Sequence, residues 1–175
     1  MRHANLKSTT KLMAVLAIAA FEAHAQESRQ PGEMGERRRI VVSIADRKLM
    51  LLDGDRLVRI YDVAVGKSST PSPRGKFAIV NRVPNPTWYG PLGVVAPGQN
   101  NPLGTRWMGL SAKGYGIHGT NVPTSIGKAA SHGCIRMRKH DLEDLFELVT
   151  VGTTVELQDA SSELLSKVLL KEVSE

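Results

Sequence analysis

The sequence has little cysteine, few aromatic side chains and no long apolar run. Its 175 residues include a single cysteine, Cys134, so an intramolecular disulfide is impossible and a disulfide-stapled scaffold is excluded. Aromatic residues make up 5% of the chain, whereas it has 16 glycines and 9 prolines, which favours a turn-rich, β-containing fold over a helical bundle. The most apolar run, residues 12–21, falls well short of the roughly 20 residues that a membrane-spanning helix needs.

The charge balance is mildly basic. Lys and Arg number 23 against 17 Asp and Glu, which gives a formal net charge of +6. The densest basic run, residues 37–39, directly precedes an apolar stretch, where such charges either protect a strand edge from aggregation or attract an anionic polymer. No basic helix and no aromatics interleaved with basic residues are visible, so we do not expect a nucleic-acid partner.

The N-terminus has the three-part layout of a secretory signal peptide. Arg2, Lys7 and Lys11 precede the apolar run, and the A-x-A pattern at residues 23–25 is typical of a cleavage site. We therefore expect residues 1–25 to be a signal peptide and residues 26–37, "QESRQPGEMGER", to be a linker. The sequence thus predicts a protein exported to the periplasm or cell envelope, with no transmembrane anchor after signal cleavage.

Residues 38–158 have the pattern of one mainly β domain. Apolar patterns predict strands at residues 39–44, 48–53, 56–66, 76–83, 106–112, 115–120 and 153–158. The Asp53-Gly54 turn signal makes the first three strands an antiparallel meander. Apolar residues at i, i+3, i+4 and i+7 predict one packed helix over residues 140–150, and residues 159–175 form a tail whose alternatives are a terminal amphipathic helix or a frayed end.

Residues 84–105 form a long segment rich in proline and glycine. Long irregular loops in compact domains are often functional, so this segment is a candidate wall for a binding site. Its aromatic residues, Trp88 and Tyr89, either pin the loop to the domain or contact a ligand.

The stretch "GYGIHGTNVPTSIGKAASHGCIRMR", residues 114–138, brings the lone cysteine close to two histidines. A cysteine nucleophile needs a general base within hydrogen-bond reach, and His118 or His132 can supply it to Cys134. The alternatives are a zinc site made by these three residues with His140, an inert buried thiol, and a noncatalytic binding module.

This stretch resembles the L,D-transpeptidase catalytic domain, also called the YkuD domain. The family signature is a histidine, a spacer, and then Ser or Thr followed by His-Gly-Cys, which here is His118 and "SHGCIR" at residues 131–136. The similarity extends over "TPSPRGKFAI" at residues 70–79 and "VGTTVEL" at residues 151–157, so residues 38–158 are the expected catalytic domain. The resemblance implies a mainly β, sandwich-like fold, in agreement with the strands predicted above.

The resemblance also implies a role for each residue of the site. Cys134 would be the nucleophile and His118 the proton donor and acceptor, oriented by the backbone carbonyl of Gly119. His132 and Gly133, with the Cys134 N–H, would shape the oxyanion hole. Arg136 would order the site or bind a substrate carboxylate. Tyr115, Trp88 and Ser131 would line the substrate groove.

The reaction implied by the resemblance is acyl transfer on peptidoglycan stem peptides. Cys134 would attack the carbonyl of diaminopimelate in a tetrapeptide stem, release D-alanine and form a thioester, without a metal or cofactor. An amine of a second stem or of an envelope lipoprotein would then take the acyl group. Two alternatives remain open, namely hydrolysis by a carboxypeptidase of the same family and peptidoglycan binding without turnover.

Overall fold

The structure, a computed structural model, describes residues 38–91 and 93–159. The predicted signal peptide, the linker and the possible C-terminal helix lie outside the described residues. The described strands are β1 (Arg38–Ser43), β2 (Lys48–Asp53), β3 (Arg56–Gly66), β4 (Gly75–Pro84), β5 (Trp88–Gly90), β6 (Gly93–Val95), β7 (Arg106–Leu110), β8 (Gly116–His118), β9 (Ala129–Ser131), β10 (Ile135–Met137) and β11 (Thr154–Gln158). The described helices are the single-turn 3-10 helix η1 (Pro123–Ser125) and the α-helix α2 (Lys139–Leu148).

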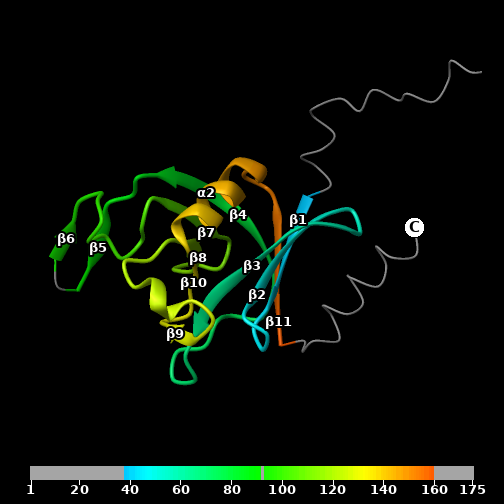
Figure 1. Ribbon diagram of the computed structural model, residues 1–175, viewed down its shortest axis with the longest axis horizontal. Helices are drawn as coiled ribbons and strands as arrows, with labels where there is room; N and C mark the ends of the chain where they lie inside the picture. The colour runs from blue at the N-terminus through cyan, green and yellow to red at the C-terminus, as the bar shows by residue number, and fades with distance from the viewer. Residues whose placement is uncertain (1–37, 92, 160–175) are drawn as a thin grey trace, which may run out of the picture. The chain divides into compact units, whose positions relative to one another are not determined.

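Nine of these strands form one sheet in the order β10-β8-β7-β4-β11-β1-β2-β3-β9, and β10 also pairs with β3. The long strands β3 and β4 are therefore shared by two layers, one containing β11, β1 and β2 and the other containing β7, β8 and β10. Figure 1 shows these two groups of strands on opposite sides of the domain. The mainly β, sandwich-like fold predicted from the sequence is confirmed.

The opening meander forms because its apolar residues alternate. Along β1 and β2, Ile40, Val42, Leu49 and Leu51 are fully buried and belong to the main core. The residues that alternate with these along the same strands form a second, smaller cluster, made of Val41, Met50 and Leu52. The predicted turn lies where it was expected, since the β2–β3 hairpin turns at Gly54 with a φ of 59°.

The helix α2 is fixed to the strands by one apolar face and by a polar contact from β3. Leu142, Leu145 and Phe146 are buried in the main core, and each such side chain contributes about 1.5–3 kcal/mol of burial free energy. Tyr61 on β3 donates a 2.6 Å hydrogen bond to Asp144 of the helix. None of the described helices is long and apolar enough to cross a membrane.

Two short neighbouring strands bring the catalytic motif together. β8 ends at His118, and β10 begins directly after Cys134. The two strands pair in parallel, with Ile135 opposite Ile117 and Arg136 opposite His118. Because Cys134 then lies level with Gly116, two segments that are distant in the sequence meet at one edge of this layer.

The segment 84–105 contains a small hairpin that the sequence did not predict. β5 pairs with β6 over three residue pairs, from Trp88 opposite Val95 to Gly90 opposite Gly93. A Cβ atom on Gly90 would lie 1.9 Å from the Trp88 ring, so the indole packs directly onto the backbone of its own hairpin. The hairpin stands beside the β7–β8 side of the domain (Figure 1).

Candidate active site

Cys134 lies on a tight turn that is held by one hydroxyl group. Gly133 has a φ of +112°, which an L side chain rarely adopts. The Ser131 hydroxyl accepts a 3.0 Å hydrogen bond from the Gly133 N–H and donates a 2.6 Å bond to the Cys134 carbonyl. Ser131 is 1% exposed, and its hydroxyl fixes the turn that presents the thiol; the residue also lines the cavity described below, on the side where the sequence placed it.

The ring of Tyr115 packs directly against the turn at Gly133. A Cβ atom on Gly133 would lie 2.5 Å from Cε1 of Tyr115 and 3.1 Å from the Pro71 carbonyl oxygen. Tyr115 also packs against the main core and is not among the described residues that line the cavity. Tyr115 was expected to line the substrate groove, but its ring packs instead against the turn that carries Cys134.

The imidazole of His118 is buried and held by a backbone carbonyl group. Nδ1 donates a 2.7 Å hydrogen bond to the carbonyl of Gly119, the orienting group that the resemblance implied. Since a carbonyl only accepts, Nδ1 carries the proton of the neutral ring and Nε2 is left as the base. Burial lowers the pKa of His118 to about 4, while the carbonyls of Gly119 and Pro102 oppose this shift and the charge of Arg136 adds to it.

One face of this imidazole is covered by Trp107. The two ring centroids are 5.7 Å apart, and the ring planes differ by 27°. Asn81 fixes the indole, because its Oδ1 accepts hydrogen bonds from Trp107 Nε1 at 3.1 Å and from the Gly109 N–H at 3.2 Å. Gly116 leaves room for the ring, since a Cβ atom there would lie 2.5 Å from it.

The thiol of Cys134 is in its protonated resting form. Its Sγ is 3.7 Å from the Gly114 carbonyl oxygen, to which it donates a weak hydrogen bond. Burial raises the pKa of the Cys134 thiol, while the Gly116 backbone N–H and the charge of Arg136 lower it. The lowered pKa of His118 and the raised pKa of Cys134 both favour the uncharged forms of the two side chains.

The charge of Arg136 acts on both His118 and Cys134. It is the register partner of His118 on β8 and of Ala64 on β3. Its buried Nε has no hydrogen-bond partner, and within residues 38–91 and 93–159 the guanidinium forms no ion pair. A partly buried cation without a carboxylate partner is unfavourable, so this arrangement suits the binding of an external anion.

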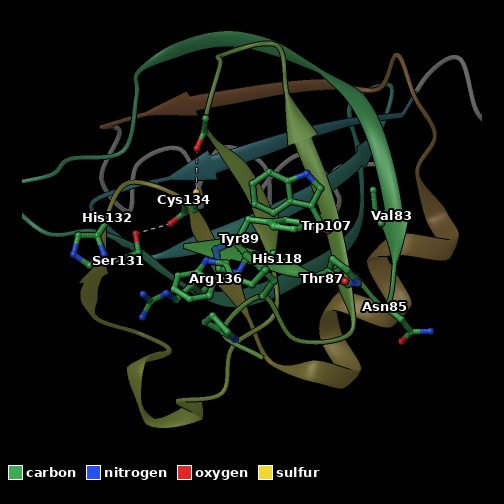
Figure 2. A pocket seen from close by; sticks show the side chains of 15 residues that line it. Val83, Asn85, Thr87, Tyr89, Trp107, His118, Ser131, His132, Cys134 and Arg136 are labelled. Atoms are coloured by element: carbon green, nitrogen blue, oxygen red, sulfur yellow. Dashed lines mark hydrogen bonds between the residues drawn. The ribbon is translucent and has the colours of Figure 1, made fainter. Parts of the chain in front are cut away.

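Cys134, His118 and Arg136 open into one cavity of about 960 Å³. Figure 2 shows these side chains together with Trp107 and the residues of the 84–105 segment around the cavity. Trp88 and Tyr89 of the β5–β6 hairpin lie in its wall, and Tyr89 is 77% exposed. A mostly apolar cavity with a few converging polar groups is the usual form of a substrate site.

The second histidine of the motif is placed differently. His132 is exposed and lies at the cavity rim, well separated from His118 in Figure 2. His140 is the second residue of α2 and contacts Asp141 at 2.9 Å. Within the described part of the chain, no three His, Cys, Asp or Glu side chains come together as a metal site requires, so the zinc alternative finds no ligand set there.

Sequence reasoning missed Trp107 and Asn101. Trp107 was assigned to a strand without a role, and its contact with His118 follows from a β7–β8 register that the sequence does not state. Asn101 is 1% exposed and makes four hydrogen bonds at the base of the 84–105 segment. The only signal for either residue was its proximity to the motif within the stretch that resembles the family.

Comparisons with known proteins agree with the fold and identify the family. The family model for the L,D-transpeptidase catalytic domain, YkuD, matches residues 37–157. The protein named as the L,D-transpeptidase YkuD of Bacillus licheniformis is 49% identical over 119 residues, which cover 68% of this chain and 64% of that protein. Its namesake in Bacillus subtilis is 44% identical over 116 residues, which cover 66% of this chain and 63% of that protein.

The matched part thus spans somewhat less than two thirds of the length of these two relatives. Among solved structures, the catalytic domain of the L,D-transpeptidase from Enterococcus faecium superposes with a TM-score of 0.57 at 25% identity. That match covers 69% of this chain and 96% of the solved domain. The family predicted from "SHGC" and its upstream histidine is confirmed, because the chain belongs to the L,D-transpeptidase catalytic domain (YkuD) family.

Proposed function

We propose that this chain is an exported, cysteine-dependent peptidoglycan L,D-transpeptidase. The observation that carries the proposal is the meeting of Cys134 and His118 on neighbouring strands at one cavity, with the unpaired cation of Arg136 beside both. The family acts on peptidoglycan stem peptides, and a stem peptide is an acyl donor that carries carboxylate groups. The chemistry of the site therefore fits the substrate class of the family.

In the first step Cys134 attacks the carbonyl carbon of diaminopimelate in a tetrapeptide stem. His118 is neutral near pH 7, since its pKa lies near 4, so Nε2 is free to take the thiol proton as the S–C bond forms. The same proton is then given to the amine of D-alanine as the C–N bond breaks. The products are free D-alanine and a thioester at Sγ, with the base restored to its starting form.

The negative oxygen that develops during attack needs a donor close to the sulfur. The Cys134 backbone N–H has no acceptor among the described residues, whereas the Gly133 N–H is already donated to Ser131. We therefore assign the Cys134 N–H as the donor to the oxyanion, and Gly133 as the residue that permits the turn.

In the second step an amine acceptor attacks the thioester carbonyl. His118 takes a proton from the amine, the C–S bond breaks, and the thiol of Cys134 is restored. An amine of a second stem gives a 3-3 cross-link, and an amine of an envelope lipoprotein gives its attachment to the wall. Water in the same position gives the tripeptide, which is the carboxypeptidase outcome.

Arg136 supplies the site for a donor carboxylate. Its guanidinium lines the cavity, and its buried Nε has no partner among the described residues. A carboxylate of the stem satisfies that atom and neutralises the charge, which a planar guanidinium does with two parallel hydrogen bonds. Binding would fix the scissile carbonyl relative to Sγ.

Export belongs to the same proposal. The layout of residues 1–25 supports a cleaved signal peptide, and peptidoglycan stems are reached outside the cytoplasmic membrane. The periplasm or cell envelope is therefore the proposed location.

Product analysis tests the proposed function. The protein beginning at residue 26 is incubated with purified disaccharide-tetrapeptide, and the products are separated and weighed by mass spectrometry. We expect loss of D-alanine with formation of a 3-3 linked dimer, whereas formation of tripeptide alone would assign the carboxypeptidase activity. Cys134→Ala should abolish both products.

A matched histidine substitution controls for general damage. His140→Gln changes an exposed side chain at the start of α2 and should leave the turnover unchanged, whereas His118→Gln should abolish it. Binding of peptidoglycan without any product, unchanged by Cys134→Ala, would contradict the proposal and favour a noncatalytic binding module.

A further inference from the structure

Asn101 closes the base of the β5–β6 hairpin with one side chain. Its Nδ2 donates to the carbonyl oxygen of Pro86 at 2.8 Å, before β5, and to those of Val95 at 3.1 Å and Ala96 at 3.2 Å, at the end of β6. The residue is 1% exposed, so these bonds are made away from water. A buried amide that joins both strands in this way fixes the hairpin on the domain.

The other end of the same amide leads to the catalytic base. Asn101 Oδ1 accepts a 2.8 Å hydrogen bond from the Leu103 N–H, and the Leu103 carbonyl accepts a 2.8 Å bond from the Gly119 N–H. The Gly119 carbonyl in turn accepts the 2.7 Å bond from His118 Nδ1. The carbonyl of Pro102, between Asn101 and Leu103, also favours the protonated imidazole and so raises the pKa of His118.

The two backbone segments in this path touch without free space. Gly104 has a φ of +66°, and a Cβ atom there would lie 2.8 Å from the Gly119 Cα. A Cβ atom on Gly119 would lie 2.9 Å from the Gly104 Cα and 3.0 Å from the Leu103 carbonyl oxygen. Because the contact is backbone against backbone, a shift of the 101–104 segment moves the loop that holds the imidazole.

We propose that Asn101 is a positioning residue that couples the β5–β6 hairpin, which forms a wall of the cavity, to the imidazole of His118. Through this amide, the cavity wall that contacts a substrate is joined rigidly to the base that takes the thiol proton, so the two move together. The inference rests on the proposed function for the role of His118 as the base, but the coupling itself is a property of the resting protein.

Two readouts without substrate test the coupling. Asn101→Ala removes all four hydrogen bonds of the side chain, so amide hydrogen exchange in β5 and β6 should become about tenfold faster or more. In the same variant water reaches the imidazole, and the pKa of His118, followed by NMR, should rise from about 4 toward its ordinary value. Neither readout depends on which polymer the enzyme uses, so failure of the proposed function would leave both in place.

A nearby asparagine provides the matched control. Asn121 donates one exposed hydrogen bond, 3.2 Å, to the Asn100 carbonyl, and Asn121→Ala should move neither readout. If Asn101→Ala fails to fold, exchange in the unmodified protein takes its place. There the amides of the hairpin should open together with those of Leu103 and Gly119, as one unit.

The coupling is overturned if the two readouts separate. Faster exchange of the hairpin with an unchanged pKa of His118 in Asn101→Ala would mean that Asn101 stabilises the hairpin alone and does not position the imidazole. In the unmodified protein, hairpin amides that exchange far faster than those of Leu103 and Gly119 would show that the two segments open separately and are not coupled.

Discussion

The indole of Trp107 stacks on the imidazole of His118, with 5.7 Å between the ring centroids. The imidazole that we propose as the base is thus held by an aromatic face and by the Gly119 carbonyl, where many hydrolases use a carboxylate. Since no carboxylate among the described residues stabilises the imidazolium, burial dominates and the pKa of His118 falls to about 4. The neutral ring is therefore the form present at physiological pH.

Trp107 should set this pKa by excluding water. Trp107→Ala opens one face of the ring, so the pKa of His118 should rise from about 4 toward its ordinary value near 6.5. Trp107→Phe keeps an aromatic cover and should leave the pKa close to that of the unmodified protein. An NMR titration of the ring measures both, and equal values in all three proteins would contradict the role of the indole.

The buried histidine should make the folded state sensitive to acid. The pKa of His118 is about 4 in the folded protein and near 6.5 in the unfolded chain, so the unfolded state binds more protons between these values. The free energy of unfolding should therefore rise with pH through this window, by about 3 kcal/mol from this group. His118→Gln should show a flatter dependence in urea unfolding, and parallel curves for the two proteins would refute the assignment.

Arg136 should promote ionisation of the thiol. Its charge lowers the pKa of Cys134, so Arg136→Gln should raise that pKa and slow alkylation by iodoacetamide at a fixed pH, by up to about tenfold. Arg136→Lys keeps the charge and should react at nearly the rate of the unmodified protein. Its KM for a stem donor should nevertheless rise, because an ammonium group cannot replace a two-point guanidinium contact. Equal alkylation rates in the glutamine variant and the unmodified protein would exclude the electrostatic effect.

The turn at Gly133 should not tolerate a side chain. Gly133→Ala combines a φ of +112° with a Cβ position 2.5 Å from the Tyr115 ring, so both stability and turnover should fall, the former by about 1–3 kcal/mol. Gly127→Ala is the matched control, since Gly127 has a φ of +83° but open space around its Cβ position. Thermal unfolding should show a larger loss for Gly133→Ala than for the control. A similar loss in both would mean that the Tyr115 contact is unimportant.

The sequence predicted the larger elements well, because long apolar patterns determine them. The third strand was expected at residues 56–66 and spans Arg56–Gly66, and the helix expected over residues 140–150 spans Lys139–Leu148. β5, β6, β9 and β10 were missed, since each has three residues and too few alternations to be recognised.

The chemistry of the site was predicted from the motif, whereas its supports depend on register. Cys134, His118 and the Gly119 carbonyl were identified from sequence similarity. The stacking of Trp107 requires the pairing of β7 with β8, and the donation of the Gly133 N–H to Ser131 depends on the conformation of one turn. Neither relationship is encoded in spacing or composition, so neither could be read before the fold was known.

The central claim is that Cys134 carries the acyl group during the reaction. The most direct test exposes the protein briefly to disaccharide-tetrapeptide and quenches the reaction with acid. The intact mass of the protein is then measured, and the modified residue is located by peptide mapping. We predict a mass increase equal to the donor minus D-alanine, located on the peptide that contains Cys134 and absent from Cys134→Ala. An adduct at another residue, or product formation by the Cys134→Ala protein, would contradict the account.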